Sequence, residues 1–184
     1  MQNEAWLEFS ERVNCEARWH VDCVTVDAPL PMAEIQRLSE YNANVLATIA
    51  AFEERRSETV DDANPLFQEM MRLDAKLTAL VDIVNRLLLP AGGLPTRQLV
   101  RFNTSGAMLP IGLLPAGDAV LLRLHPDACP SLPLELPAIV ARRFDDGLAF
   151  VAFAKLSDTT SDALERLVFR LHRRKVAETR QSAQ

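Results

Sequence analysis

The residues best suited to nucleophilic or metal chemistry are three cysteines and three histidines, namely Cys15, Cys23, Cys129, His20, His125 and His172. No two cysteines have the CxxC spacing of a zinc or redox site, and an odd number of thiols cannot all pair as disulfides. His125 and Cys129 share the segment HPDACP, where two prolines indicate a turn and nothing activates the thiol. We therefore expect reduced thiols in a cytoplasmic protein, no metal, no cofactor and no enzymatic activity.

Two arginines, Arg97 and Arg101, stand four residues apart in the segment RQLVRFNTSGAMLP. Arginine binds phosphate oxygens through two parallel hydrogen bonds, so an RxxxR pair is a sound phosphate ligand. In a strand, however, alternate side chains share a face, and both arginines would project on the side of Leu99. Solvated strand charge is the competing interpretation of the two arginines.

The composition is that of an ordinary globular protein. The 184 residues are 48% apolar and 24% charged, enough for one domain, or for one small domain with an elaboration. A net charge of −5 and only 6% aromatic residues argue against nucleic-acid binding, despite the short basic runs ARRF and HRRK. No apolar stretch approaches the roughly 20 residues of a transmembrane helix. The acidic N-terminal segment does not resemble a secretory signal.

Residues 1–29 are predicted to contain a short helix and then a strand. Within CEARWHVDCVTVD, alternate positions are occupied by Ala17, Trp19, Val21 and Cys23. This period of two is typical of a strand with one buried face. The prolines of DAPLP end the strand because they cannot donate to a sheet.

Residues 31–89 are predicted to form two helices, over 31–56 and 65–89. The second has an apolar seam whose members are alternately four and three residues apart: Leu66, Met70, Leu73, Leu77, Leu80, Val84 and Leu87. A seven-residue repeat keeps facing a partner only when helices supercoil around one another. Further apolar residues widen this face, which suits more than two helices: Phe67, Val81 and Leu88. We therefore expect a homo-oligomer, a tetramer before a dimer, with packing on the chain's own core as the alternative.

The first of these helices, 31–56, is predicted to pack against the second as an antiparallel hairpin. Asn42 takes a seam position in its apolar spacing, so in a hairpin it would fix the register of the two helices. The alternative is that Asn42 faces solvent.

Residues 95–184 are predicted to form short strands followed by one helix. RQLVRFN, SGAMLP, AVLLRLH, LELPAIVARRF and LAFVAFAKL are β-like runs separated by turn residues at the spacing of a small barrel. The segment FDDG at 144–147 predicts a hairpin turn. We expect the last segment to form a helix over the mouth or the edge of the barrel, with one apolar face made by Leu164, Leu167, Val168 and Leu171.

These strands and the closing helix ALERLVFRLHRRK resemble a PilZ domain, and RFNTSGAMLP resembles the strand and turn that carry its [D/N]-x-S-x-x-G motif. The resemblance covers 95–175, with the strand near 16–26 as the first barrel strand. It implies an α+β fold: a small antiparallel barrel closed by a C-terminal helix, plus an inserted helical hairpin with a coiled-coil seam. The chain then divides into 1–29, an oligomerising insertion at 30–92, and 93–184. Such heptad helices are similar to those of an atypical, tetrameric branch of the family.

The resemblance implies cyclic di-GMP as the ligand, and a degenerate ligand-binding set made of Arg97, Arg101, Asn103 and Ser105. Two features nevertheless predict weak or absent binding. Ligand-binding members have an RxxxR loop before the first strand, whereas Arg97 and Arg101 lie after it. The glycine position of the motif is Met108, with Gly106 two places early, and a side chain there obstructs a ligand. We therefore expect a non-enzymatic adaptor in bacterial cyclic di-GMP-linked signalling, such as motility, pilus function or virulence, acting through an unidentified protein partner. The alternative is a genuine receptor that uses arginines at unusual positions.

The C-terminal segment is basic although the protein is acidic. Residues 163–184 contain six basic and two acidic residues, whereas residues 31–90 contain six basic and ten acidic ones. Part of this pattern is helix chemistry, because the helix dipole stabilises cations near the C-terminus. Four of the bases form a predicted docking surface for an acidic protein partner: Arg170, Arg173, Arg174 and Lys175. The alternatives are solvent exposure, or contact with the acidic helices of the same or a neighbouring chain.

Overall fold

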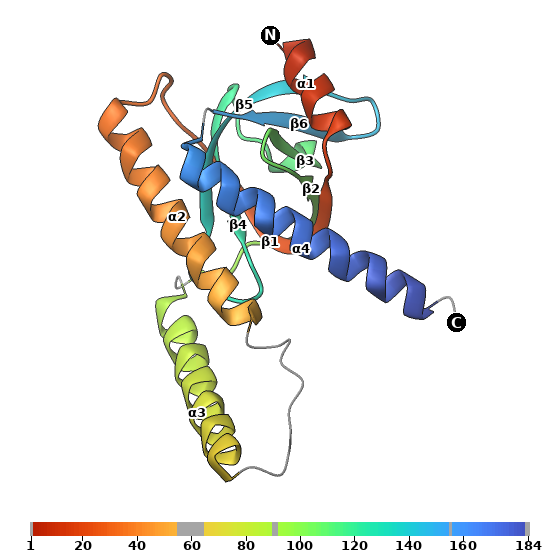
Figure 1. Cartoon of the computed structure of the whole chain (residues 1–184). Helices are drawn as coiled ribbons and strands as arrows, with labels where there is room; N and C mark the ends of the chain where they lie inside the picture. The colour runs from red at the N-terminus through yellow and green to blue at the C-terminus, as the bar shows by residue number, and fades with distance from the viewer. Residues whose placement is uncertain (1, 55–64, 90–91, 155, 183–184) are drawn as a thin grey trace.

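The computed structural model describes residues 2–54, 65–89, 92–154 and 156–182, and over these residues the chain forms a six-stranded barrel and four α-helices (Figure 1). In chain order the elements are α1 (Gln2–Glu11), β1 (Cys15–Thr25), α2 (Met32–Glu54), α3 (Pro65–Leu88), β2 (Arg97–Phe102), β3 (Gly106–Pro110), the short 3-10 helix η1 (Ile111–Leu113), β4 (Ala119–His125), β5 (Leu134–Arg143), β6 (Leu148–Phe153) and α4 (Asp158–Ser182). The predicted α+β fold, with an antiparallel barrel and a C-terminal helix, is confirmed.

The barrel is closed and antiparallel, with strand order β1-β2-β3-β6-β5-β4. β1 is long enough to join both ends of the sheet, since residues 15–20 pair with β2 and residues 20–25 pair with β4. α2 and α3 therefore separate the first two strands in the sequence without interrupting the barrel. The predicted hairpin turn at 144–147 connects β5 to β6, and Gly147 supplies its positive φ of 81°.

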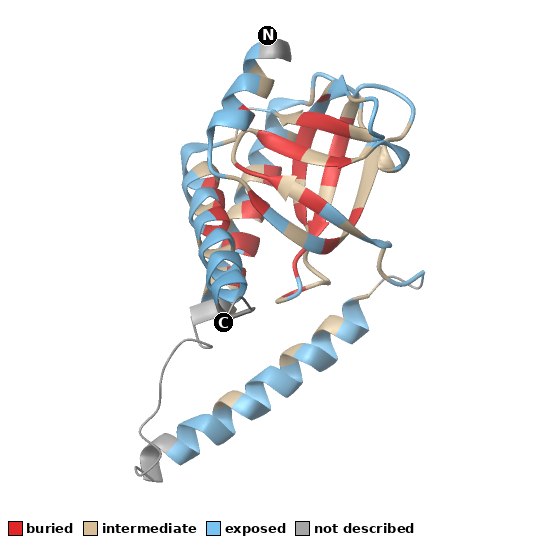
Figure 2. Ribbon diagram, turned by 90° about the vertical axis from the view of Figure 1, so that its right-hand side faces the viewer, coloured by how far each residue is buried: buried red, intermediate tan, exposed pale blue. Residues whose placement is uncertain are grey.

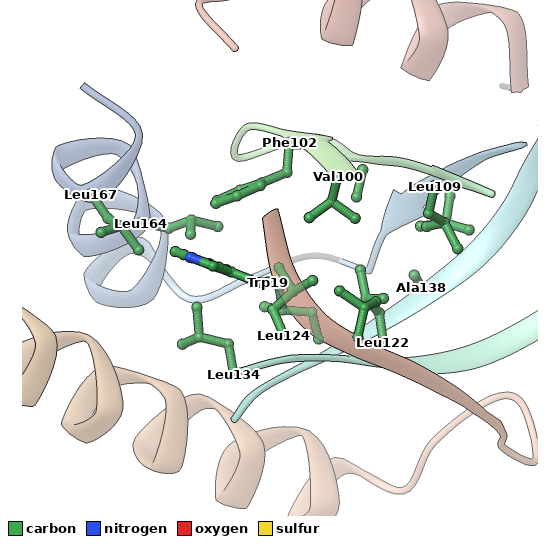
Figure 3. Close-up of a cluster of buried hydrophobic side chains, with 14 of the residues drawn as sticks. Trp19, Val100, Phe102, Leu109, Leu122, Leu124, Leu134, Ala138, Leu164 and Leu167 are labelled. Carbon is green, nitrogen blue, oxygen red and sulfur yellow. The ribbon is translucent and has the colours of Figure 1, made fainter. Parts of the chain in front are cut away.

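The hydrophobic core fills the barrel and extends under the helices. Alternation along β1 turns Trp19 and Val21 inward, as the sequence predicts, and both are buried. The Trp19 and Phe102 ring centroids are 5.4 Å apart. Figure 3 shows Leu164 of α4 beside the Trp19 indole. This cluster joins the closing helix to the barrel.

α4 begins at Asp158 because the preceding residue caps it. The Ser157 hydroxyl oxygen accepts a hydrogen bond from the Thr160 N–H at 3.2 Å. The helix packs on α2 and β1. Its predicted apolar face is confirmed, with Leu164, Leu167 and Val168 buried and Leu171 half-buried. No described helix is both long and apolar enough to cross a membrane.

α1 covers one end of the barrel with aromatic side chains. Phe9 is fully buried, and its ring centroid lies 4.9 Å from that of Phe150. The Trp6 ring lies 4.9 Å from Phe144, and the Arg142 guanidinium lies over the same Phe144 ring at 4.9 Å. These contacts hold α1 on β5 and β6, next to the turn between β2 and β3.

α2 packs on the barrel and on α4, which corrects the predicted hairpin. Over the described residues its neighbours are α4 and β5, and the buried face includes Val45 and Ile49. α3 lies beyond the end of α2 and points away from the barrel (Figure 1). The hairpin fails because the apolar face of α2 is already covered by the barrel.

Both predicted roles of Asn42 are also wrong, because its side chain is buried against β5. Asn42 Nδ2 donates to the Glu135 carbonyl at 2.7 Å, and Asn42 Oδ1 accepts from the Glu135 N–H at 2.8 Å. The amide thus pairs with backbone groups that a neighbouring strand would otherwise bind. Asn42 anchors α2 to the sheet.

Candidate functional site

The predicted phosphate-binding residues lie on β2 and in the turn that leads into β3. Arg97, Leu99 and Arg101 project outward, while Val100 is buried and Gln98 is half-buried, so the predicted shared face is confirmed. The Arg97 guanidinium pairs with Asp127, and its Nε donates to the Arg18 carbonyl at 3.0 Å. Arg97 therefore connects β2 to β1 and to the turn after β4.

Arg101 lies against apolar and sulfur groups. Its guanidinium carbon is 5.5 Å from the centroid of the Phe9 ring, and its Nη2 is 2.8 Å from Met108 Sδ. Met108 stands opposite Arg101 in the β2–β3 register. Met108 is also the position where the motif has glycine, so its thioether fills space that a glycine would leave open.

Asn103, the first motif residue, is 2% exposed and makes its hydrogen bonds inside the protein. Its Nδ2 donates to the Phe9 carbonyl at 3.0 Å and to Asn14 Oδ1 at 3.1 Å. Its Oδ1 accepts from the Ser105 N–H at 2.8 Å, which closes the turn locally. In this conformation Asn103 holds α1 on the barrel.

Of the next motif positions, Ser105 is half-buried and Gly106 is buried. Ser105 Oγ is buried without a hydrogen-bond partner among the described residues. Gly106 allows β3 to approach β6 closely, because a Cβ there would lie 2.3 Å from the Val151 carbonyl oxygen and 2.6 Å from Phe150 Cε2. The glycine is required for packing.

The segment before β1 places one arginine near the motif turn. Arg12 Nη1 donates to Thr104 Oγ1 at 3.0 Å, and its other terminal nitrogen pairs with Glu8 at 2.9 Å. The next arginine along the chain, Arg18, lies on β1 itself. The sequence before β1 thus lacks the second arginine of an RxxxR loop.

The apolar seam of α3 is exposed, as the mostly pale-blue helix in Figure 2 shows. The seam side chains that the structure describes are between 44% and 78% exposed: Met70, Leu73, Leu77, Leu80, Val84 and Leu87. The Leu66 and Phe67 side chains lie outside the described residues. An apolar stripe of this length is far larger than the scattered exposed side chains of an ordinary surface.

A second face of α3 is turned toward the body of the protein. Asp74, Val81 and Asn85 are half-buried, and the Ser131 hydroxyl donates to Asn85 Oδ1. Val81 therefore lies on this inner face and does not widen the seam as predicted, whereas Leu88 is exposed. The inner face of α3 thus contacts its own chain, whereas the exposed seam has no partner in the described chain.

The basic side chains of α4 lie close to acids of the same chain. Lys175 pairs with Glu16 of β1. Arg174 and Lys175 line a cavity of about 530 Å³ together with Asp74 and Asp82 of α3. Arg170 is half-buried, and Arg173 is exposed. Two of the four predicted docking residues therefore border the cavity that faces α3.

The thiols and histidines form no catalytic pair in the structure. His125 Nδ1 is 2.8 Å from the Pro130 carbonyl and its Nε2 is 3.3 Å from Asp22 Oδ1, so both ring nitrogens face other groups than Cys129. Burial raises the pKa of Cys129 to about 11. No group of three or more His, Cys, Asp or Glu side chains suited to a metal occurs among the described residues.

Sequence reasoning missed the residues that fix the motif turn from far along the chain. Phe9 and Asn14 lie about 90 positions before Asn103. No spacing rule links such distant residues. The one sequence signal for this turn was Asn103 at the end of a predicted strand, because an Asn side chain can close a turn by hydrogen-bonding to the backbone two residues on.

The chain was compared with known families and structures. Residues 46–181 match the profile described as "Atypical PilZ domain, cyclic di-GMP receptor". No curated protein sequence matches the chain significantly. A solved structure of a pathogenic protein from Xanthomonas campestris, described as a tetrameric PilZ domain self-assembled via an unusual helical bundle, is 27% identical with a TM-score of 0.71, and the alignment covers 95% of this chain and 97% of that one. The chain belongs to the atypical PilZ domain family.

Proposed function

We propose that this protein is a non-enzymatic adaptor of cyclic di-GMP-linked signalling in the bacterial cytoplasm, and that it assembles as a tetramer through α3. The exposed seam of α3 carries the proposal, because it offers a long apolar stripe to other copies of the chain. The similar Xanthomonas campestris protein is tetrameric through a helical bundle. Residues 30–92 would then form the oligomerising insertion, with its contacts made by α3 and not by α2.

The tetramer is tested by changing one residue in the middle of the seam. Leu77→Asp places a carboxylate inside the bundle, where an unpaired charge is strongly unfavourable. Light scattering of the wild-type protein should give a mass four times 20.5 kDa, and Leu77→Asp should give a monomer. Ala75→Asp introduces the same charge on an exposed position outside the seam and should leave the mass unchanged. A monomeric wild-type protein at micromolar concentration would refute the proposal.

Binding of cyclic di-GMP is proposed to be weaker than about 10 μM, or absent. Three features support this: Asn103 is hydrogen-bonded inside the protein, the hydroxyl oxygen of Ser105 is buried, and Met108 occupies the glycine position. Calorimetric titration of the dinucleotide into the full chain tests it. A submicromolar constant that is lost in Arg97→Ala and Arg101→Ala, but kept in the exposed Arg143→Ala, would support the alternative of a genuine receptor.

Docking of an acidic protein partner on the basic face of α4 is a separate part of the proposal. Arg173 supports it because its side chain is exposed at the middle of that face. Reversing Arg173 and Arg174 to Glu should abolish partner capture while the oligomer mass stays constant. If the mass or the thermal stability falls and capture is unchanged, the basic face serves contacts within the assembly.

A further inference from the structure

A cavity of about 490 Å³ lies between the first half of α2 and the start of α4. One side is formed by α2 and the other by the connection from β6 to α4, and Pro137 of β5 completes the lining. No residue of α3, of β2 or of the motif turn lines it. It is therefore a different place from the oligomer seam and from the motif turn, and its volume suits a small organic molecule.

Most of the lining is apolar. Met32 and Ile35 of α2 are 78% and 38% exposed, so they stand at the open side of the cavity, whereas Leu38 is buried. Leu156, from the connection that precedes α4, is half-buried. Walls of this kind bind an apolar body, and the unbranched Met32 side chain can adjust to its shape.

Three hydroxyl groups form a polar cluster in the lining: Ser39, Ser157 and Thr160. Ser39 Oγ donates to Ser157 Oγ at 2.6 Å, and Ser157 Oγ donates to Thr160 Oγ1 at 2.9 Å. Thr160 Oγ1 in turn donates to the Ser39 carbonyl at 3.2 Å. Because a hydroxyl has one hydrogen, all three hydrogens are already used. The hydroxyl cluster therefore offers a ligand lone pairs and no donor.

The charges beside the cavity are predominantly negative. The lining residue Gln36 donates from Nε2 to Glu40 Oε1 at 3.1 Å, which places the Glu40 carboxylate next to the cavity. Asp158, the first residue of α4, adjoins the lining in the sequence and is exposed. Within residues 31–42 and 156–160 the one base is Arg37, which binds Glu34 at 2.7 and 2.9 Å. Each helix N-terminus contributes only about half a positive charge, so the carboxylates of Glu40 and Asp158 outweigh both helix ends.

We propose that this cavity binds a small organic amine, with its ammonium group on the oxygens of Ser39 and Ser157 and its organic body against Ile35 and Leu156. An ammonium group has three donors and no acceptor, which matches a cluster that offers only lone pairs. The nearby carboxylates attract a cation and repel a ligand that carries a carboxylate or a phosphate. The inference goes beyond the proposed function, which assigns no ligand to this cavity and does not depend on it.

Hexylammonium, hexanol and hexanoate are the probes, because they share one alkyl chain and differ in charge. Each is titrated into the full chain and followed by calorimetry. Hexylammonium should bind saturably, hexanol should bind about tenfold more weakly, and hexanoate should not bind measurably. Methylammonium lacks the apolar body, so it should bind about a hundredfold more weakly than hexylammonium, or worse.

Substitutions test each part of the site. Glu40→Gln and Asp158→Asn each remove one carboxylate and keep the shape of the side chain, so each should weaken hexylammonium severalfold and leave hexanol unchanged. Ile35→Ala removes part of the apolar wall and should weaken both probes. Asp145→Asn is the matched control, because Asp145 is exposed in the turn between β5 and β6. Lys155 lies outside the described residues, and Lys155→Gln should not weaken hexylammonium, since it removes a positive charge.

The methionine methyl groups locate the bound amine in NMR spectra. Met32 lines the cavity, whereas Met70 and Met71 belong to α3 and Met108 belongs to β3. On titration with hexylammonium the Met32 signal should shift with the calorimetric dissociation constant, and the other three signals should stay in place. The proposal is overturned if hexylammonium does not bind saturably, if hexanoate binds as tightly, or if neither carboxylate variant weakens hexylammonium more than the control does. It is also overturned if the signals of α3 or β3 shift and that of Met32 does not, because the amine would then lie at the seam or beside the motif turn.

Discussion

At the scale of single residues, the motif of this chain serves its own structure. Asn103 binds the backbone of α1, and Gly106 lets two strands approach. Both residue types are those that a ligand-binding turn would use. The side-chain amide of Asn103 suits a structural or a ligand-binding role. It both donates and accepts hydrogen bonds, so it can bind a backbone carbonyl or the edge of a guanine base.

Gly106→Ala tests the packing role of the motif glycine. The added methyl would lie 2.3 Å from the Val151 carbonyl oxygen, a backbone atom that cannot move without distorting β6. We expect a loss of about 1–3 kcal/mol in the free energy of unfolding, measured by urea denaturation. Gly112→Ala is the control, since its Cβ would have no atom within 4 Å and should change stability little. Equal stability of the two variants would contradict the packing role.

The three thiols are predicted to be unreactive in the folded protein. Burial raises the pKa of Cys15 and of Cys23 to about 12, with the negative charge of Asp22 adding to the effect on Cys23. Because the raised pKa favours the neutral thiol, the reactive thiolate at pH 8 should be scarcer than in an ordinary cysteine by about a thousandfold at Cys15 and Cys23. At Cys129, where burial raises the pKa to about 11, it should be scarcer by about a hundredfold.

Maleimide labelling at pH 8 checks this expectation. The native protein should label slowly, and the urea-unfolded protein should label at all three cysteines within the same time. Rapid labelling of the native protein would show an accessible thiolate, and would reopen the hypothesis of a thiol nucleophile.

At the scale of elements, the two long helices have different partners. α2 covers the barrel with a narrow apolar face that includes Val45 and Ile49. α3 turns its inner, half-polar face toward the body and leaves its strongest apolar face outside. We therefore expect the heptad repeat to make contacts outside the single chain, since a helix packed on one globular core has no need of a seven-residue period.

Asn42→Ala is expected to loosen α2 from the barrel. The change leaves the N–H and C=O of Glu135 without the partners they have at 2.8 and 2.7 Å, and should cost about 1–3 kcal/mol in the free energy of unfolding. Urea denaturation followed by circular dichroism measures it. Asn44→Ala, two positions along and exposed, is the matched control. If both variants unfold at the same urea concentration, Asn42 does not anchor the helix.

The sequence predicts a feature of this structure when the interacting residues lie close together along the chain, and not when they lie far apart. Trp19 and Val21 could be assigned to the core because alternation is local to one strand, and the seam of α3 because its repeat is local to one helix. Asn42 could not be assigned, since its partner Glu135 is 93 positions away and a polar residue in an apolar spacing has several explanations. The same holds for the candidate site. The sequence motif indicated Asn103, but nothing in the sequence indicated its hydrogen-bond partner Phe9.

At the scale of the whole molecule, the barrel is stabilised within one chain, whereas the proposed bundle of α3 helices would be stabilised between chains. β1 closes the barrel by pairing with both β2 and β4, so strands far apart in the sequence depend on one another. The outer face of α3 adds no such contact within the chain, because its seam is exposed. Most of the stability of a helix in a protein comes from the packing of its amphipathic face. The stability of α3 should therefore depend on association.

This coupling predicts a melting temperature that depends on protein concentration. Association binds the folded form and not the unfolded one, so mass action stabilises the wild type more at higher concentration. Over a hundredfold range of concentration the Tm of the wild type should rise by several degrees, given that about 1 kcal/mol shifts the Tm of a domain of this size by roughly 2–4 °C. Leu77→Asp should melt at one temperature throughout, at or below the lowest wild-type value, and Ala75→Asp should follow the wild type. Calorimetry of the three proteins decides the matter: a wild-type Tm independent of concentration would mean that the seam of α3 contributes nothing to stability through other copies of the chain.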